Sequence, residues 1–148
     1  MKIAICDDDN SFLQNVKFLI NKIYSNPDKL SIYEYESGEQ FLLQFKPQLY
    51  DVIILDIEMC GITGLEVAEE IRKIDKSVIL AFFTSHQEFA TLGYEVNAFR
   101  YILKNQPEHM FINQFKSIFD EYHQSHITFP VQASSCLLYT SPSPRDCS

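Results

Sequence analysis

The sequence contains no apolar run near the length of a membrane-spanning helix, which needs about 20 consecutive apolar residues. The opening residues, MKIAICDDD, pass from a short apolar run directly into acids. A signal peptide would have a longer apolar region and a small-residue cleavage site. These two absences predict a soluble, cytoplasmic protein without a membrane partner.

Paired metal-binding cysteines and an excess of positive charge are also missing. The four cysteines (Cys6, Cys60, Cys136 and Cys147) form no CxxC pair and have no spacing typical of zinc sites. We therefore expect free thiols in a reducing compartment. The net charge is −8, and an acidic surface repels nucleic-acid phosphates. The chain as it stands is not expected to bind DNA.

Strand-like and helix-like segments alternate along residues 1–125, and 46% of the chain is hydrophobic, enough for a core. Apolar runs predict strands at residues 2–6, 30–35, 51–55, 78–83 and 99–103. Helical spacing of apolar residues predicts helices at residues 12–23, 37–45, 65–74, 88–95 and 110–122. Either Asp9 or Asn10 would cap the first helix. This order predicts one α/β domain, a doubly wound five-stranded parallel sheet covered on both faces.

The end of the chain has a different composition. Residues 126–133 include ITFPVQ, which could begin a strand, and we interpret them as the start of a second domain or a linker. Residues 134–148, SSCLLYTSPSPRDCS, are rich in Ser and Pro and lack periodicity. They are either a disordered tail or non-native sequence from a mis-joined reading frame.

Polar side chains with compatible chemistry follow four of the predicted strands. They are Asp7, Asp8 and Asp9 after the first strand, Asp56 after the third, Thr84 after the fourth and Lys104 after the fifth. The carboxyl ends of parallel strands meet at one edge of the sheet, where ligands bind. Each residue alone has an ordinary explanation as a capping or solvated side chain. Their combination favours a functional site.

The chemistry of this set suits phosphoryl transfer. Clustered carboxylates repel one another unless a cation lies among them, and hard oxygen ligands suit Mg²⁺. With Mg²⁺ bound, Asp56 can attack a phosphoryl group and form an acyl phosphate. Thr84 can donate a hydrogen bond, and Lys104 a positive charge, to the phosphoryl oxygens.

With these residues the chain resembles the receiver domain of bacterial two-component response regulators. The shared pattern is the acid pair, the Asp ending the third strand, Gly-x-x-Gly beyond it, the Thr ending the fourth strand, and an aromatic three residues before the Lys. The resemblance covers residues 1–124. It implies a flavodoxin-like (βα)5 fold with strand order 2-1-3-4-5.

The resemblance also implies a role for each site residue. Asp56 would be the phosphoacceptor for a sensor histidine kinase, with Mg²⁺ as cofactor. The implied metal ligands are Asp8 and Asp56 directly, Asp7 through water and the backbone carbonyl of Glu58. Thr84 and Lys104 would contact the phosphoryl group. Tyr101 would be a switch aromatic that turns inward when Thr84 moves, or else an ordinary half-buried strand tyrosine.

One position departs from the family pattern, because Asn105 stands where a proline with a cis peptide bond usually follows the Lys. A cis bond before a residue other than proline costs about 2.5–4 kcal/mol, so the sequence leaves the geometry of this loop open. The phrases NAFRYILKNQPEH and ITFPV resemble regulators that carry a LytTR-type DNA-binding domain. The resemblance implies a transcription regulator that binds DNA only through that effector domain and dimerises on phosphorylation. Residues 126–133 would then be the start of the truncated effector domain or a linker to it.

Two other functions remain open at this point. One is a Mg²⁺-dependent phosphatase or phosphotransferase of the haloacid dehalogenase type, although the first strand leads into DDDN rather than DxDx(T/V) and no cap domain is apparent. The other is a receiver-like interaction module that acts without phosphorylation. We expect a signalling domain rather than an enzyme, one that can catalyse its own phosphorylation and dephosphorylation.

Overall fold

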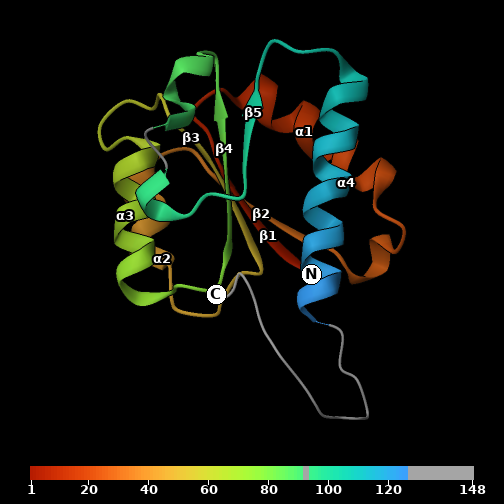
Figure 1. Cartoon of the computed structure of the whole chain (residues 1–148), viewed down its shortest axis with the longest axis horizontal. Coiled ribbons are helices and arrows are strands. Elements are labelled where there is room, and N and C mark those ends of the chain that lie inside the picture. Colours follow the sequence, from red (N-terminus) through yellow and green to blue (C-terminus); the bar gives the residue numbers. More distant parts are fainter. Residues whose placement is uncertain (92–93, 127–148) are drawn as a thin grey trace.

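The computed structural model describes residues 1–91 and 94–126, and a five-stranded parallel sheet forms its centre (Figure 1). The strands are β1 (Lys2–Cys6), β2 (Ser31–Tyr35), β3 (Val52–Asp56), β4 (Ile79–Thr84) and β5 (Arg100–Leu103). Their order across the sheet is β2-β1-β3-β4-β5. The predicted fold class and strand order are confirmed.

Four α-helices of the described residues cover the sheet on both faces. They are α1 (Asn10–Ile23), α2 (Gly38–Gln44), α3 (Gly64–Ile74) and α4 (Glu108–Ser125). Helices α2 and α3 lie against one face, and α1 and α4 against the other (Figure 1). None of the described helices is long and apolar enough to span a membrane.

The central strand β3 explains why its sequence is continuously apolar. All five of its residues are buried, because β1 and β4 flank it and helices cover both faces. Alternate residues point to opposite layers: Ile53 packs in the layer that contains Phe41 and Val67, and Ile54 in the layer that contains Phe115.

Side-chain caps set where two of the helices begin. The Asp9 carboxylate accepts the Phe12 N–H at 3.2 Å, so Asp9 rather than Asn10 caps α1. Thr63 and Glu66 form a reciprocal capping box, and α3 therefore starts at residue 64, one residue earlier than predicted. Helix α4 starts at Glu108, two residues before the predicted start.

The predicted helix at residues 88–95 is wrong. The chain forms two short 3₁₀ segments there, η2 (Gln87–Thr91) and η3 (Tyr94–Val96). The Arg72 side chain on α3 donates hydrogen bonds to the carbonyls of Val96 at 2.7 Å and Asn97 at 3.2 Å. Asn97 has a φ of 54°, in the left-handed region. These bonds tie the chain just after the predicted helix to α3, and a helix of eight residues is marginal without tertiary packing of its own.

A further 3₁₀ segment, η1 (Pro27–Lys29), leads into β2. Residues 127–148 lie outside the described residues. They include nearly all of the predicted domain start at 126–133, the whole of 134–148, Cys136 and Cys147. Of the other two cysteines, Cys6 is a buried free thiol and Cys60 an exposed one.

Candidate functional site

Two neighbouring strands bring the acids of the predicted site together. Cys6 of β1 lies opposite Leu55 of β3, so Asp7 and Asp56 follow at adjacent positions on the carboxyl edge of the sheet. Asp7 is fully buried and Asp56 is 2% exposed. One carboxylate oxygen from each of Asp7, exposed Asp8 and Asp56 lies within 4.8 Å of the others. The structure therefore brings together three of the four acids expected at this edge, while Asp9 caps α1 instead.

Lys104 comes to the same point from the end of β5. Its Nζ lies 2.9 Å from Oδ2 of Asp7 and 3.2 Å from Oδ2 of Asp56. The Lys104 N–H donates to the Thr84 carbonyl at 2.9 Å, which continues the β4–β5 pairing beyond the strand end. The peptide bond to Asn105 is trans, since the described residues contain no cis bond.

Without a bound cation, the surroundings of Asp56 disfavour its ionised form. Burial raises its pKa from 3.8 to about 6, and the charge of Asp7 adds to the rise, while Lys104 and the Glu58 N–H oppose it. For Lys104, burial acts to lower the pKa, but its bonds and charge interactions with the two acids outweigh burial and raise it. One ammonium therefore does not fully compensate the buried carboxylates.

The donor set fits a hard divalent cation such as Mg²⁺. It consists of three carboxylates, and Mg²⁺ prefers oxygen ligands and keeps several waters. Asp8 is exposed and accepts the Cys60 N–H at 3.3 Å, so the cluster has a side that faces solvent. A bound cation would offset the raised pKa of Asp56, because it favours the ionised form of the carboxyl.

The Gly-x-x-Gly pattern has a steric reason in the loop after β3. A Cβ at Gly64 would lie 2.2 Å from the backbone oxygen of Asp56, so only glycine lets α3 begin this close to the site. Gly61 has a φ of 81°, which favours glycine. The Glu58 N–H donates to Oδ1 of Asp56 at 3.2 Å and helps to orient the carboxylate.

Thr84 ends β4 next to the acid cluster, one residue beyond Phe83, which pairs with Asp56. It is buried, and its hydroxyl donates to the His86 carbonyl at 3.1 Å and accepts the His86 N–H at 3.0 Å. In this structure the hydroxyl is therefore engaged by its own loop.

Tyr101 lies on β5 opposite Phe82 of β4, and the two rings stack with centroids 5.3 Å apart. The ring is half-buried and packs against the core layer of α2 and α3. The switch role of Tyr101 stays a prediction, and so does the metal-binding role of the Glu58 carbonyl.

Two residues at the site carried no chemical signal in the sequence. Phe12 counted only as an apolar helix position, yet its ring lies under the Lys104 ammonium, with the centroid 4.8 Å from Nζ. His86 lies two residues after Thr84, and its Nε2 is 3.2 Å from Oε2 of Glu58. Only the position of His86 directly after a strand end could have drawn attention to it.

Together, the fold and the acid–lysine cluster define the class of receiver domains, in which a buried aspartate ends the central strand. Residues 3–116 match the family model of the response regulator receiver domain, and the chain belongs to this family. The predicted resemblance is confirmed.

Among its relatives is the sensory transduction protein LytR of Staphylococcus epidermidis, 34% identical over 104 residues, which are 70% of this chain and 40% of that protein. The sensory transduction protein LytT of Oceanobacillus iheyensis is 32% identical over 111 residues, 74% of this chain and 44% of that protein. The chain thus spans less than half the length of these curated relatives.

A similar solved structure is the response regulatory domain of protein mrkE from Klebsiella pneumoniae. It has 28% identity and a TM-score of 0.71, and the match covers 84% of this chain and 99% of that one.

Proposed function

We propose that this receiver domain accepts a phosphoryl group on Asp56 from a sensor histidine kinase in a Mg²⁺-dependent reaction. The observation that carries the proposal is the surroundings of Asp56. It is a buried carboxylate whose Oδ2 lies 3.2 Å from the Lys104 ammonium, beside two further acids suited to a cation. A buried acid with a raised pKa and a specific charge partner is a candidate for function.

The reaction transfers a phosphoryl group from a histidine nitrogen to a carboxylate oxygen. Asp56 attacks the phosphorus, the P–N bond breaks as the P–O bond forms, and the departing imidazole nitrogen takes up a proton. Such transfer depends mainly on positioning and charge stabilisation. Lys104, already beside Asp56, would place its charge on the phosphoryl oxygens.

Asp8 and Asp56, with Asp7 through water and the Glu58 carbonyl, would hold the Mg²⁺. When bound, Mg²⁺ neutralises the acids and the oxygens of the transferred group. The chain's own part is to orient Asp56 through the Glu58 N–H, at 3.2 Å, and to keep bulk water from its buried side.

Phosphorylation would act on the segment between β4 and β5. The Thr84 hydroxyl would give up its 3.1 Å bond to the His86 carbonyl for a charge-assisted bond to a phosphoryl oxygen. Tyr101 would then turn inward from its present stacking on Phe82. The two arrangements form a two-state element whose populations the phosphoryl group biases.

The output of the whole protein is proposed from its relatives. One relative is named the transcriptional regulatory protein LytR of Staphylococcus aureus. We propose that residues 126–133 begin a LytTR-type DNA-binding domain or its linker and that residues 134–148 are a non-native tail. The phosphorylated regulator would form a homodimer and bind DNA in the cytoplasm. Apart from promoting its own phosphorylation and dephosphorylation, it would not act as an enzyme.

The experiment that tests this function uses acetyl phosphate in place of the kinase. We expect the intact mass of the full chain to rise by one phosphoryl group when Mg²⁺ is present and not when it is chelated. Asp56→Asn should show no gain, while Asp120→Asn, a matched change at an exposed position on α4, should behave as the wild type. A folded wild-type protein that gains no mass would instead support the phosphorylation-independent interaction module.

A further inference from the structure

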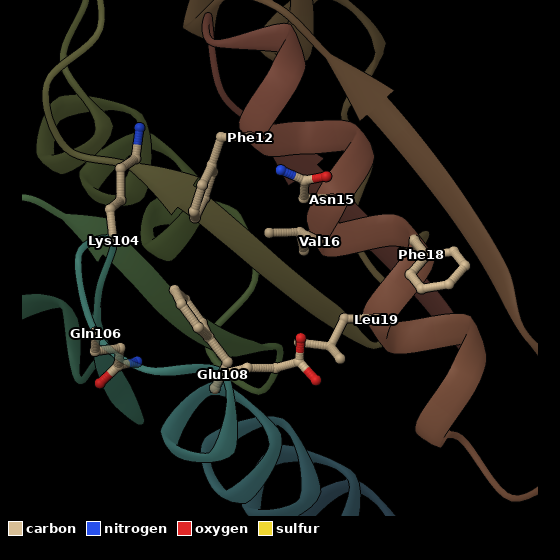
Figure 2. Close-up of a pocket in the computed structure, with 9 residues that line it drawn as sticks. Phe12, Asn15, Val16, Phe18, Leu19, Lys104, Gln106 and Glu108 are labelled. Atoms are coloured by element: carbon tan, nitrogen blue, oxygen red, sulfur yellow. The ribbon is translucent and has the colours of Figure 1, made fainter.

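The Lys104 ammonium is enclosed by two acids and an aromatic ring. Its Nζ contacts the carboxylates of Asp7 and Asp56, and it lies over the Phe12 ring, 4.8 Å from the ring centroid. The Lys104 side chain is only 17% exposed. Figure 2 shows Phe12 and Lys104 side by side at one end of a groove between α1 and α4.

The Phe12 ring is held by rigid parts of the fold. Its backbone N–H is bound by the Asp9 cap in the first turn of α1. The ring meets Phe83 edge-to-face, with centroids 4.8 Å apart and planes at 90°. Phe83 is fully buried and pairs with Asp56 in the sheet. Strand β4 therefore pairs with β3 at Asp56 and, through Phe83, also packs against the ring that faces Lys104.

Besides contacting the Lys104 ammonium, the Phe12 ring lines the groove between α1 and α4. Its volume is about 530 Å³, and both Phe12 and Lys104 line it, together with Phe111 and polar residues of α1 and α4. Water that fills the groove would hydrate the ammonium and draw it away from the acids if the ring were absent. With the ring and the two carboxylates in contact with it, the Lys104 side chain is 17% exposed.

We propose that Phe12 is a positioning residue for Lys104: its ring face attracts the ammonium and keeps it directed at Asp56, ready for the incoming phosphoryl group. This inference rests on the proposed function. A cation over an aromatic face is attracted by the ring quadrupole, more strongly when water is excluded. Phe12 touches neither metal nor phosphoryl group and acts only through Lys104.

The test measures the initial rate of Mg²⁺-dependent phosphorylation by acetyl phosphate, using intact mass of the full chain. Phe12→Leu keeps an apolar side chain but removes the ring, and we expect the rate to fall about 5- to 30-fold. Phe12→Tyr keeps the ring and should restore a rate near that of the wild type. Phe18→Leu is the matched control, because Phe18 lines the same groove and is 70% exposed, and among the described residues it has neither a ring contact with Phe12 nor a cation–π contact with Lys104; its rate should be unchanged.

A purely structural role of Phe12 is separated by a double-mutant cycle with Lys104→Met. If the ring acts through the ammonium, Phe12→Leu should not slow the residual phosphorylation of Lys104→Met any further. Nuclear magnetic resonance adds a readout that does not depend on activity. The ε protons of Lys104 should carry an upfield ring-current shift that Phe12→Leu removes and Phe12→Tyr retains. Circular dichroism confirms that each variant is folded.

The proposal is overturned if Phe12→Leu leaves the rate unchanged, if Phe18→Leu lowers it equally, or if Phe12→Leu has the same effect in the Lys104→Met background. A folded wild type that takes up no phosphoryl group would refute the proposed function itself. In that case, the ring-current shift alone would decide whether the ring holds the ammonium, and its absence would overturn that placement too.

Discussion

Asp56→Asn should make the metal-free protein more stable near neutral pH, because the native fold holds the Asp56 carboxylate at an energetic cost. Asp56 is 2% exposed, and its pKa rises from 3.8 to about 6, first through burial and then through the charge of Asp7. A carboxyl whose pKa is raised on folding binds its proton more tightly in the native state. Stability therefore falls as pH rises from about 4 to about 6, and then levels off.

The size of this effect follows from the two pKa values. The rise from 3.8 to about 6 is about 2 pKa units, and at about 1.36 kcal/mol per unit this corresponds to about 3 kcal/mol. Asparagine retains an acceptor for the Glu58 N–H but also weakens the pairing with Lys104, which keeps Asp7 as a partner. We therefore expect Asp56→Asn to gain about 1–3 kcal/mol at about pH 8 without metal, and almost nothing at about pH 4.

The assay is urea unfolding of the full chain followed by circular dichroism, since the chain has no tryptophan. Each variant is measured across this pH range with a chelator and again with excess Mg²⁺. Mg²⁺ should stabilise the wild type by mass action and Asp56→Asn much less. Asp120→Asn, on the exposed surface of α4, controls for the loss of one negative charge from the whole protein.

Two results would refute this reasoning. The first is a metal-free Asp56→Asn that is no more stable than wild type at about pH 8. The second is a stability difference that stays constant as the pH falls to about 4, which would mean that titration of the carboxyl is not its cause.

Three further predictions concern residues of α3 and its N-terminal cap, next to the site. Gly64→Ala should lower the free energy of unfolding by about 2–4 kcal/mol, because the new Cβ would lie 2.2 Å from the Asp56 carbonyl oxygen; a loss below about 1 kcal/mol in urea unfolding would contradict this. Arg72→Met should cost about 2–4 kcal/mol and speed amide exchange after Val96, since it removes the guanidinium hydrogen bonds to that segment; unchanged exchange would show that the anchor is dispensable. Thr63→Ala should cost about 1 kcal/mol through loss of the α3 cap, measured by the same unfolding assay, and an equal cost in a Glu66→Ala background would argue against the capping box.

Local patterns in the sequence were sufficient for most of the fold. Strand β3 is recognisable because a central parallel strand buries both faces and so reads as an unbroken apolar run. The start of α3 was predicted one residue late, because the capping pair Thr63 and Glu66 was overlooked, although its bonds span only three residues. These features depend on neighbours in the chain.

The segment after β4 shows where local reasoning fails. Residues 88–95 have a weak helical pattern, but Arg72 on α3 binds the carbonyls of Val96 and Asn97, and the chain turns in 3₁₀ segments instead. The acceptors lie 24 and 25 residues along the chain from Arg72. No periodicity within the segment itself contains that information.

The sequence by itself determined which side chains lie at the strand ends, because each predicted strand stops where its apolar run ends. That was enough to place Asp7, Asp56, Thr84 and Lys104 on one edge of the sheet. Only the tertiary structure decided how strongly they act on one another. The strand order brings Lys104 within 2.9 Å of Asp7, burial raises the pKa of Asp56, and helix packing sets Phe12 beneath the ammonium. Electrostatic energy depends on distance and on exclusion of water, and packing sets both.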